Sequence, residues 1–316
     1  MLSASPALLS TIILAALSAT TLMCPSSPLL PELTLQQLQR PPYSTRLDRL
    51  EWRMLLCHVL QLSRVELITQ DQRTITGTEL AQLDKLCLRR EQGEPMAYLL
   101  GQREFYGLDF IVSPAVLIPR PETELLVELA LAHLPASALA PPPAQPARLL
   151  DMGTGSGALA VALAHTRPEL QVCALDASLA ALAIARQNAA KHQVAIELIE
   201  SDWYGALPPG VRFDVIVANP PYIVAGDPHL QQGDLRFEPI DALTDHQDGL
   251  SSLRQIIAGA PKHLQSGGWL LMEHGYDQAE SVRALLTQAG AGRFTQIQSW
   301  RDLAGIERVT GAQWPG

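Results

Sequence analysis

Residues 213–222 read Phe-Asp-Val-Ile-Val-Ala-Asn-Pro-Pro-Tyr, an apolar run followed by a short polar segment. The run 213–218 predicts a buried strand. Two consecutive prolines cannot continue a central strand, and each fixes φ at about −65°, so the strand should end in a stiff turn at Asn219, Pro220, Pro221 and Tyr222. In an open α/β sheet, ligands bind at the carboxyl ends of the strands. We therefore expect the chemistry of this protein at that turn.

The turn presents hydrogen-bond acceptors. Neither proline has an N–H group, so the side-chain oxygen of Asn219 and the backbone carbonyls beside it are hard to satisfy internally. A planar NH₂ group would satisfy them, and the ring of Tyr222 could stack on its plane. The pattern predicts a site for an amide or an exocyclic amine. The alternative is a turn that only ends the strand, with an asparagine as its cap.

The composition is that of a globular protein. The chain has 316 residues, of which 47% are hydrophobic and 17% charged, and its length predicts two domains. Residues 1–150 carry 12 Lys and Arg against 14 Asp and Glu, whereas residues 151–316 carry 11 against 18. The more acidic half holds the predicted site, which disfavours tight non-specific binding to a phosphate backbone. The cysteines form no CxxC pair, which favours a reducing compartment over a disulfide framework or a zinc site.

Residues 1–31 contain no charged residue, and Pro6–Met23 is apolar and rich in Ser and Thr. No Lys or Arg precedes this run, which is barely long enough to span a bilayer. Three interpretations remain open: a wrongly assigned start codon with translation beginning at Met23, a disordered or membrane-associated tail, and an export signal. We favour the first, which implies a cytoplasmic protein without stable membrane association.

The rest of the chain divides into three predicted parts. In residues 32–100, apolar side chains recur at three- and four-residue spacings, which predicts a small helical domain that binds a partner or caps the fold. Residues 101–118 predict a hairpin linker, with Gly107 between two aromatic-rich runs. Residues 119–316 predict an α/β domain. Its first helix should run from Glu122 to about His133, and Ala136–Ala147 is rich in alanine and proline, as in a flexible connection.

A glycine-rich turn follows the first strand of the α/β domain, Arg148–Met152. The turn consists of Gly153, Thr154, Gly155, Ser156 and Gly157. Glycines let the backbone approach a bound cofactor closely. The next strand ends at Asp176, about 20 residues further on, where a carboxylate can accept hydrogen bonds from both hydroxyls of a ribose.

Other polar residues also follow strands. Asp202 and Trp203 come after the strand Ile196–Glu200 and would flank an adenine. Asp151, immediately before the glycine turn, is well placed for the ammonium group of an amino-acid moiety. Arg120, between two prolines, either faces the site or forms a structural ion pair.

The glycine turn alone is ambiguous, because with Ala158 it also satisfies the dinucleotide fingerprint G-x-G-x-x-A. A nicotinamide-dependent dehydrogenase is therefore a competing interpretation. Asp151 argues against it, since a carboxylate there would repel a pyrophosphate. The end of the strand 213–218 also provides no general acid for hydride chemistry.

The C-terminal part completes the alternating pattern. It predicts a helix over 248–263, a strand over 268–273, a helix over 277–289, and an antiparallel pair formed by 294–299 and 307–313. The histidines form no ligand cluster, so no metal is expected, and His274 is interpreted as structural. The acidic segment Asp227–Asp248 is interpreted as a solvated rim.

The glycine turn, Asp176 and Asn219–Tyr222 resemble the class I methyltransferases that use S-adenosylmethionine to modify amide or exocyclic amine nitrogens. Over roughly residues 34–312 the chain also resembles the release factor glutamine methyltransferase family, PrmC/HemK. That resemblance rests on Pro95–Gly101, Arg103–Phe105, Ile118–Glu124, Gln231–Pro239 and Glu273–Gly275. It implies a Rossmann-like domain with a seven-stranded mixed sheet, preceded by a small all-α domain and a hairpin.

The resemblance also implies an activity: methylation of the N5 amide of the glutamine in the Gly-Gly-Gln motif of peptide chain release factors. By position, Gly153–Gly157, Asp176 and Trp203 would bind the cofactor, Asn219 would contact both cofactor and substrate, and Pro220–Tyr222 would complete the glutamine pocket. Methylation of a ribosomal-protein glutamine and DNA adenine-N6 methylation remain as alternatives, although the second should require a basic recognition region that the sequence lacks. A non-catalytic scaffold is disfavoured, because the glycine turn, the acid and the Asn-Pro-Pro-Tyr segment are all intact.

Overall fold

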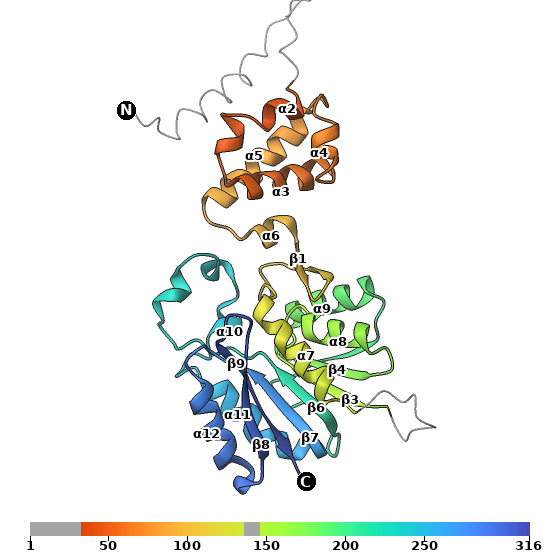
Figure 1. Cartoon of the computed structure of the whole chain (residues 1–316), viewed down its shortest axis with the longest axis vertical. Coiled ribbons are helices and arrows are strands. Elements are labelled where there is room, and N and C mark those ends of the chain that lie inside the picture. The colour runs from red at the N-terminus through yellow and green to blue at the C-terminus, as the bar shows by residue number, and fades with distance from the viewer. Residues whose placement is uncertain (1–32, 136–145) are drawn as a thin grey trace, which may run out of the picture. The chain divides into compact units, whose positions relative to one another are not determined.

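The computed structural model describes residues 33–135 and 146–316 (Figure 1). The interpretations of residues 1–31, and of most of the connection 136–147, therefore lie outside the described residues. The chain divides into two compact units, residues 1–83 and 84–316, with the division inside helix α5 (Gly77–Glu91). The domain boundaries predicted at residues 31, 100 and 118 remain predictions. No helix within the described ranges is long and apolar enough to cross a membrane.

The first unit is helical, as the apolar periodicity predicts. It contains α2 (Leu35–Leu38), η1 (Tyr43–Thr45), α3 (Arg49–Leu60), α4 (Glu66–Thr69) and the first part of α5. Thr34 and Gln37 form a capping box at the start of α2, and Asp48 caps α3 by accepting the Leu50 N–H at 2.7 Å. The indole N–H of Trp52 donates to the Leu38 carbonyl at 2.9 Å, so the unit's largest buried side chain is also satisfied.

The second unit begins with the rest of α5 and with α6 (Met96–Leu100), which lead into a hairpin of β1 (Gln102–Phe105) and β2 (Leu108–Ile111). Gly107, at φ 75°, makes the turn, which confirms the predicted hairpin. Phe105 and Phe110 are buried with ring centroids 6.0 Å apart and anchor the hairpin to the core.

A seven-stranded mixed sheet is the centre of the second unit, and its order β5-β4-β3-β6-β7-β9-β8 confirms the predicted fold class. The strands are β3 (Arg148–Met152), β4 (Gln171–Asp176), β5 (Ile196–Glu200), β6 (Phe213–Ala218), β7 (Leu264–Glu273), β8 (Thr295–Arg301) and β9 (Glu307–Trp314). β9 runs antiparallel to both of its neighbours, β7 and β8, and the other strand pairs of this sheet are parallel. The chain builds β3, β4 and β5 outward and then returns to place β6 on the other side of β3. The strand order therefore reverses between β3 and β6, which is where this class of sheet binds ligands.

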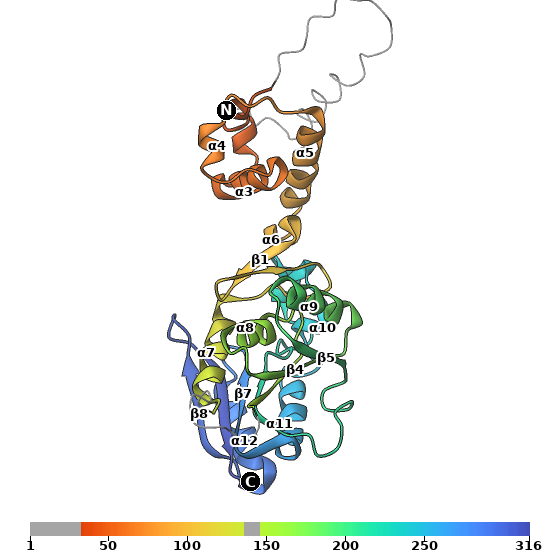
Figure 2. The same cartoon turned by 90° about the vertical axis from the view of Figure 1, so that its right-hand side faces the viewer.

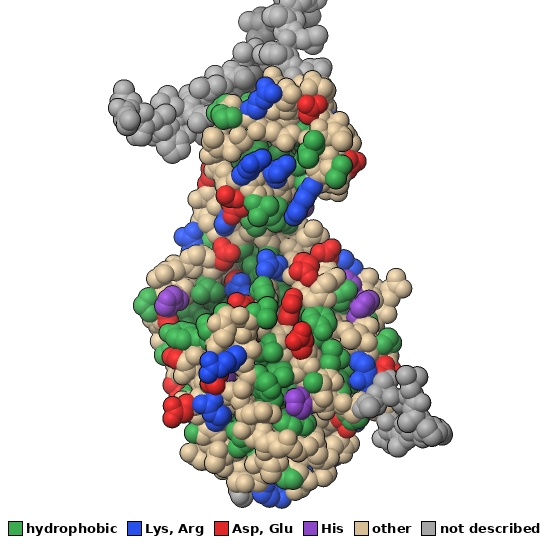
Figure 3. Space-filling view, in the orientation of Figure 1, with side chains coloured by type: hydrophobic (Ala, Val, Ile, Leu, Met, Phe, Trp, Pro, Cys, Tyr) green, Lys and Arg blue, Asp and Glu red, His purple; other side chains and the backbone are tan. Residues whose placement is uncertain are grey.

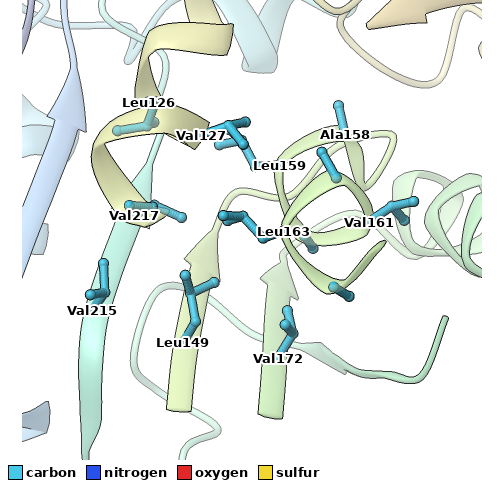
Figure 4. Packing of buried hydrophobic residues seen from close by; sticks show 14 of the residues in the cluster. Leu126, Val127, Leu149, Ala158, Leu159, Val161, Leu163, Val172, Val215 and Val217 are labelled. Carbon is cyan, nitrogen blue, oxygen red and sulfur yellow. The ribbon is translucent and has the colours of Figure 1, made fainter. Parts of the chain in front are cut away.

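Helices cover both faces of the sheet (Figures 1 and 2). One face carries α7 (Glu124–His133), α8 (Ala158–Thr166) and α9 (Leu179–Lys191), and the other carries α11 (Ser251–His263) and α12 (Ala279–Gln288). Alternate strand residues face opposite cores. Leu149 and Val215 pack toward α7 and α8, as Figure 4 shows, whereas Leu150 and Ile216 pack toward α11. Both faces of the central strands are thus buried, which explains their continuous apolar sequence.

Several predicted boundaries in the C-terminal part shift by a few residues. The strand predicted from residue 268 begins at Leu264, because the exposed residues Gln265, Ser266 and Gly267 separate the buried Leu264 from the apolar run and interrupt its signal. The helix predicted from Asp248 begins at Ser251, because the Asp245 carboxylate accepts the N–H groups of Gly249 and Ser251 and holds a turn there. The segment interpreted as a solvated rim contains η3 (Pro228–Gln231), η4 (Leu235–Phe237) and α10 (Ile240–Leu243).

Candidate active site

A cavity of about 470 Å³ lies at the carboxyl ends of β3, β4, β5 and β6. This volume is in the range of sites for small ligands and cofactors. Seven residues that the sequence predicted for the site line it: Gly153, Gly155, Asp176, Asp202, Trp203, Asn219 and Pro221. The rim segment also contributes to its wall through Pro239, Asp241 and Ala242, so that segment is more than a solvated surface.

The glycine turn and Asp176 are joined by hydrogen bonds. The Gly155 N–H donates to one carboxylate oxygen of Asp176 at 2.8 Å, and the Ser178 N–H donates to the other at 2.8 Å. Gly155 has φ 56°, a conformation that L side chains rarely adopt. Burial raises the pKa of Asp176 above its ordinary value, while the two N–H groups oppose that shift. The carboxylate therefore stands rigidly at the cavity wall with acceptor capacity left on both oxygens.

Four predicted cofactor residues do not line the cavity but support it: Asp151, Thr154, Ser156 and Gly157. The Thr154 hydroxyl donates to Asp151 Oδ2 at 2.6 Å. Gly157 packs against α9, where a Cβ would lie 3.2 Å from the backbone of Ala185. Ser156 offers its carbonyl to the side chain of Asn188. These residues hold the turn in its shape.

Asp151 is fully buried, and its Oδ1 atom has no hydrogen-bond partner within the described part of the chain. Burial raises the pKa of its carboxyl to about 7. A buried acceptor without a donor costs free energy. A cationic N–H donor near the base of the glycine turn would remove that cost, which suits the ammonium group predicted for this position.

Asn219 follows β6 directly and is oriented by a neighbouring hydroxyl. Its Nδ2 atom donates to Thr123 Oγ1 at 3.1 Å. Among the described residues, no N–H or O–H group donates a hydrogen bond to Asn219 Oδ1 or to the Pro220 carbonyl. The Tyr222 carbonyl, in contrast, accepts from Gln278 Nε2 at 3.0 Å. The turn thus keeps two acceptors without a donor from the described residues, as the pair of prolines predicts, and Asn219 itself lines the cavity.

A second cavity, of about 360 Å³, lies beyond the turn. Tyr222, Glu273, Arg120 and Arg308 are among the residues that line it. Arg120 also pairs with the buried carboxylate of Glu238, whose other oxygen accepts the Ile118 N–H at 3.0 Å. Arg120 is therefore in a structural ion pair and lines the second cavity, and its predicted contact with a substrate stays a prediction.

Three polar residues of this region carry no predicted role, although each lies in a quoted motif: Thr123, Glu238 and Glu273. Glu273 ends the buried strand β7 at the same sheet edge as Asn219, and is only 2% exposed. A charged residue that ends an apolar strand is a signal that sequence reasoning could have used. Thr123 and Glu238 leave no such signal, because their contacts join segments far apart in the chain.

His274 is buried, and its ring nitrogens contact the Gly275 carbonyl and the Thr310 hydroxyl at 2.8 and 2.7 Å. Both nitrogens are satisfied, which confirms its structural interpretation. Within the described ranges, no three or more His, Cys, Asp or Glu residues are grouped so that they could hold a metal ion.

Comparison with known proteins agrees with this geometry. The profile of the methyltransferase small domain matches residues 127–233, and that of the PrmC N-terminal domain matches residues 44–101. A release factor glutamine methyltransferase from Burkholderia pseudomallei is 51% identical over 276 residues, which cover 85% of this chain and 93% of that protein. The chain belongs to the release factor glutamine methyltransferase family.

Other matches agree. A family member from Bordetella pertussis is 53% identical over 265 residues, covering 84% of this chain and 94% of its own length. Among solved structures, the hMettl16 catalytic domain in complex with MAT2A 3′UTR hairpin 1 has a TM-score of 0.52 at 14% identity, and the match covers 88% of this chain and 93% of that chain. At that identity the likeness shows the fold alone. The protein is a methyltransferase, and the dehydrogenase interpretation is excluded.

Proposed function

We propose that this protein transfers a methyl group from S-adenosylmethionine to the N5 amide of the glutamine in the Gly-Gly-Gln motif of peptide chain release factors. The observation that carries the proposal is the pair of unpaired acceptors at the turn, Asn219 Oδ1 and the Pro220 carbonyl. A primary amide has two N–H groups and needs two such acceptors. The names of the curated relatives support the choice of release factors as the substrate.

The first cavity offers polar groups that suit this cofactor, and Asp151 lies buried behind the glycine turn. Asp176 would accept hydrogen bonds from the ribose hydroxyls, and Asp202 and Trp203 would lie beside the adenine. The ammonium group would approach the unpaired Oδ1 of Asp151. Trp203 has φ 47°, a strained conformation that a binding site can use to fix a ring in place.

An amide nitrogen is a poor nucleophile, because its lone pair is delocalised into the carbonyl group. When Asn219 Oδ1 and the Pro220 carbonyl each accept one N–H, they favour a pyramidal nitrogen whose lone pair is available. S-adenosylmethionine, when bound, supplies an electrophilic methyl group on a sulfonium. The nitrogen bonds to the methyl carbon while the carbon–sulfur bond breaks with its electron pair on sulfur, and the proton then passes to water. The turn contributes position and electrostatics.

The site offers little for a nucleic-acid substrate. On the face in Figure 3, acidic and basic side chains of the second unit are interspersed, and they form no continuous basic surface on that face. The α/β part of the chain is also the more acidic half. A protein substrate agrees better with this charge distribution than a phosphate backbone does.

The test is transfer of labelled methyl from S-adenosylmethionine by the full-length chain. The acceptors, offered in parallel, are a purified release factor, its variant with Ala in place of the Gln of Gly-Gly-Gln, ribosomal proteins and duplex DNA. The proposal expects label on the intact release factor and none on its variant. Label on a ribosomal protein or on DNA alone would overturn it in favour of the corresponding alternative.

A further inference from the structure

We infer that Thr123 and Glu273 are positioning residues that fix which way the Asn219 amide points. Together with Tyr222 they form a directed chain of hydrogen bonds that keeps Asn219 Oδ1 turned toward the substrate. This inference deepens the proposed function and rests on it for the identity of the methyl acceptor. The orientation of the amide can be measured without any acceptor.

The chain of hydrogen bonds has four members from three segments: the turn after β6, η2 and β7. Asn219 Nδ2 donates to Thr123 Oγ1 at 3.1 Å, and that hydroxyl donates to Glu273 Oε2 at 2.7 Å. The Tyr222 hydroxyl reaches the other oxygen, Oε1, at 3.4 Å, the longest contact of the set. Thr123 ends η2 (Pro121–Thr123) and is 5% exposed. Two residues of the Asn-Pro-Pro-Tyr turn are therefore tied to one buried carboxylate.

The carboxylate decides the direction of the whole chain. An ionised carboxylate can only accept hydrogen bonds, so it commits the single hydroxyl proton of Thr123. The Thr123 oxygen then has only lone pairs to offer Asn219. It can pair with the NH₂ end of the amide but not with Oδ1. The amide is thereby locked with its acceptor toward the cavity.

Without this lock the two orientations of the amide would differ little in energy. The oxygen and nitrogen ends of an Asn side chain have nearly the same shape, and a hydroxyl with a free proton can pair with either end. A flipped amide would present N–H groups to the N–H groups of the substrate. Such a site would bind glutamine poorly and would not activate it.

The arrangement buries the carboxylate of Glu273, which costs free energy. Burial raises the pKa of its carboxyl to about 7, while the hydroxyls of Thr123 and Tyr222 and the charge of Arg308 oppose the shift, and Glu122 adds to it. Arg120 and Asp234 also line the adjoining cavity, and the neighbouring ring of His274 is buried with its pKa lowered by burial. As pH falls through 7, the carboxyl gains a proton and can donate to Thr123. The hydroxyl of Thr123 is then released to donate to Asn219 Oδ1.

The kinetic test compares a small set of variants. Thr123→Val removes the hydroxyl and is expected to lower kcat by about 10- to 100-fold, less than removal of the acceptor itself. Thr123→Ser restores the hydroxyl and should recover most of kcat. Thr287→Val, the same change at an exposed site on α12, should have no effect. Glu273→Gln should lower kcat to a similar degree, with S-adenosylmethionine affinity retained.

The chain of hydrogen bonds from Asn219 through Thr123 to Glu273, here called the relay, also predicts coupling between the effects of substitutions and a dependence of kcat on pH. Because Thr123 and Glu273 act as one unit, the double variant Thr123→Val with Glu273→Gln should lose little more than either single variant. Wild-type kcat should rise as pH increases through about 7. The Glu273→Gln profile should be flat there, because the amide does not titrate. The relay would be refuted if the losses in kcat of the two single variants multiply in the double variant. It would also be refuted if kcat of Glu273→Gln depends on pH as it does in the wild type.

A spectroscopic test needs no substrate. The sequence contains two asparagines, Asn188 and Asn219. Protein labelled with ¹⁵N only in asparagine therefore gives two side-chain NH₂ signals, and the signal missing from Asn219→Ala identifies Asn219. Asn188 is the internal control, since its Nδ2 donates to the Ile111 and Ser156 carbonyls.

The Asn219 signal should shift with a midpoint near pH 7 in the wild type and stay constant in Glu273→Gln. A signal that does not titrate in the wild type, or that titrates equally in the variant, would overturn the relay. The proposed function and the relay can be refuted independently of each other. Absence of label on the release factor refutes the proposed function, while the titration still decides the relay.

Discussion

Replacing Asn219 by Ala tests the core of the proposed chemistry. The substitution removes Oδ1, one of the two unpaired acceptors at the turn, and leaves the Pro220 carbonyl to hold one N–H of the substrate. It also removes the hydrogen bond that Asn219 Nδ2 donates to Thr123 Oγ1. The Thr123 hydroxyl can then pair with water or face the adjoining cavity. The strand β6 and its hydrogen bonds to β3 and β7 are untouched, so the sheet should be preserved.

The expected loss follows from the role of a single aligned acceptor. Removal of one preorganised hydrogen-bonding group that acts in the transition state costs about 10²–10³ in kcat, or about 2.7–4 kcal/mol. Asn219 is also one contact at the wall of the cofactor cavity. One neutral hydrogen bond is worth about 0.5–1.5 kcal/mol, so the affinity for S-adenosylmethionine should fall by about tenfold at most.

The assay measures methyl transfer to a release factor at saturating S-adenosylmethionine, and calorimetry measures cofactor binding to the same samples. Far-UV circular dichroism and the melting temperature establish that the variant is folded. Turnover within tenfold of wild type would refute the role of Asn219 as an acceptor. A cofactor affinity that falls as far as kcat would instead make Asn219 a residue of the cofactor site.

Three further outcomes are expected. Asp176→Ala should weaken S-adenosylmethionine binding by about 10- to 100-fold, measured by calorimetry, because a charged acceptor is lost. Gly157→Ala should lower the free energy of unfolding by about 1–3 kcal/mol in denaturant titrations, because Gly157 has φ +81° and the added Cβ meets Ala185 at 3.2 Å. Glu273→Gln should flatten the dependence of stability on pH. The raised pKa means that the folded state holds an extra proton between the unfolded value and about 7, so Glu273 lowers wild-type stability as pH rises through that window by up to about 1.4 kcal/mol per pH unit. A slope in Glu273→Gln equal to that of the wild type would refute this assignment.

Much of the fold could be predicted because its signals are local. Continuous apolar runs between glycine turns and helical periods predict a parallel sheet with helices on both faces, and the chain forms that sheet. The strand 148–152 has the predicted bounds, and the glycine turn follows it directly. The start of β7 moved because exposed residues, Gln265 to Gly267, lie between the buried Leu264 and the apolar run, and sequence patterns report burial and not pairing.

The sequence by itself determined the composition of the candidate site. Gly155, Trp203 and Asn219 come after parallel strands and Asp176 ends one, and the carboxyl ends of parallel strands meet at one edge, so local sequence and a general rule of sheets were enough to bring them together. The pair of prolines likewise predicts unpaired acceptors, because it removes N–H groups from the turn.

Only the tertiary structure decided the direction of the Asn219 amide. Thr123 and Glu273 lie 96 and 54 positions away from Asn219 and touch its network only once the chain has folded. Thr123 Oγ1 meets Glu273 Oε2 across 150 positions. A carboxylate acquires a raised pKa and a fixed role as an acceptor through burial, and burial is a property of the packed fold.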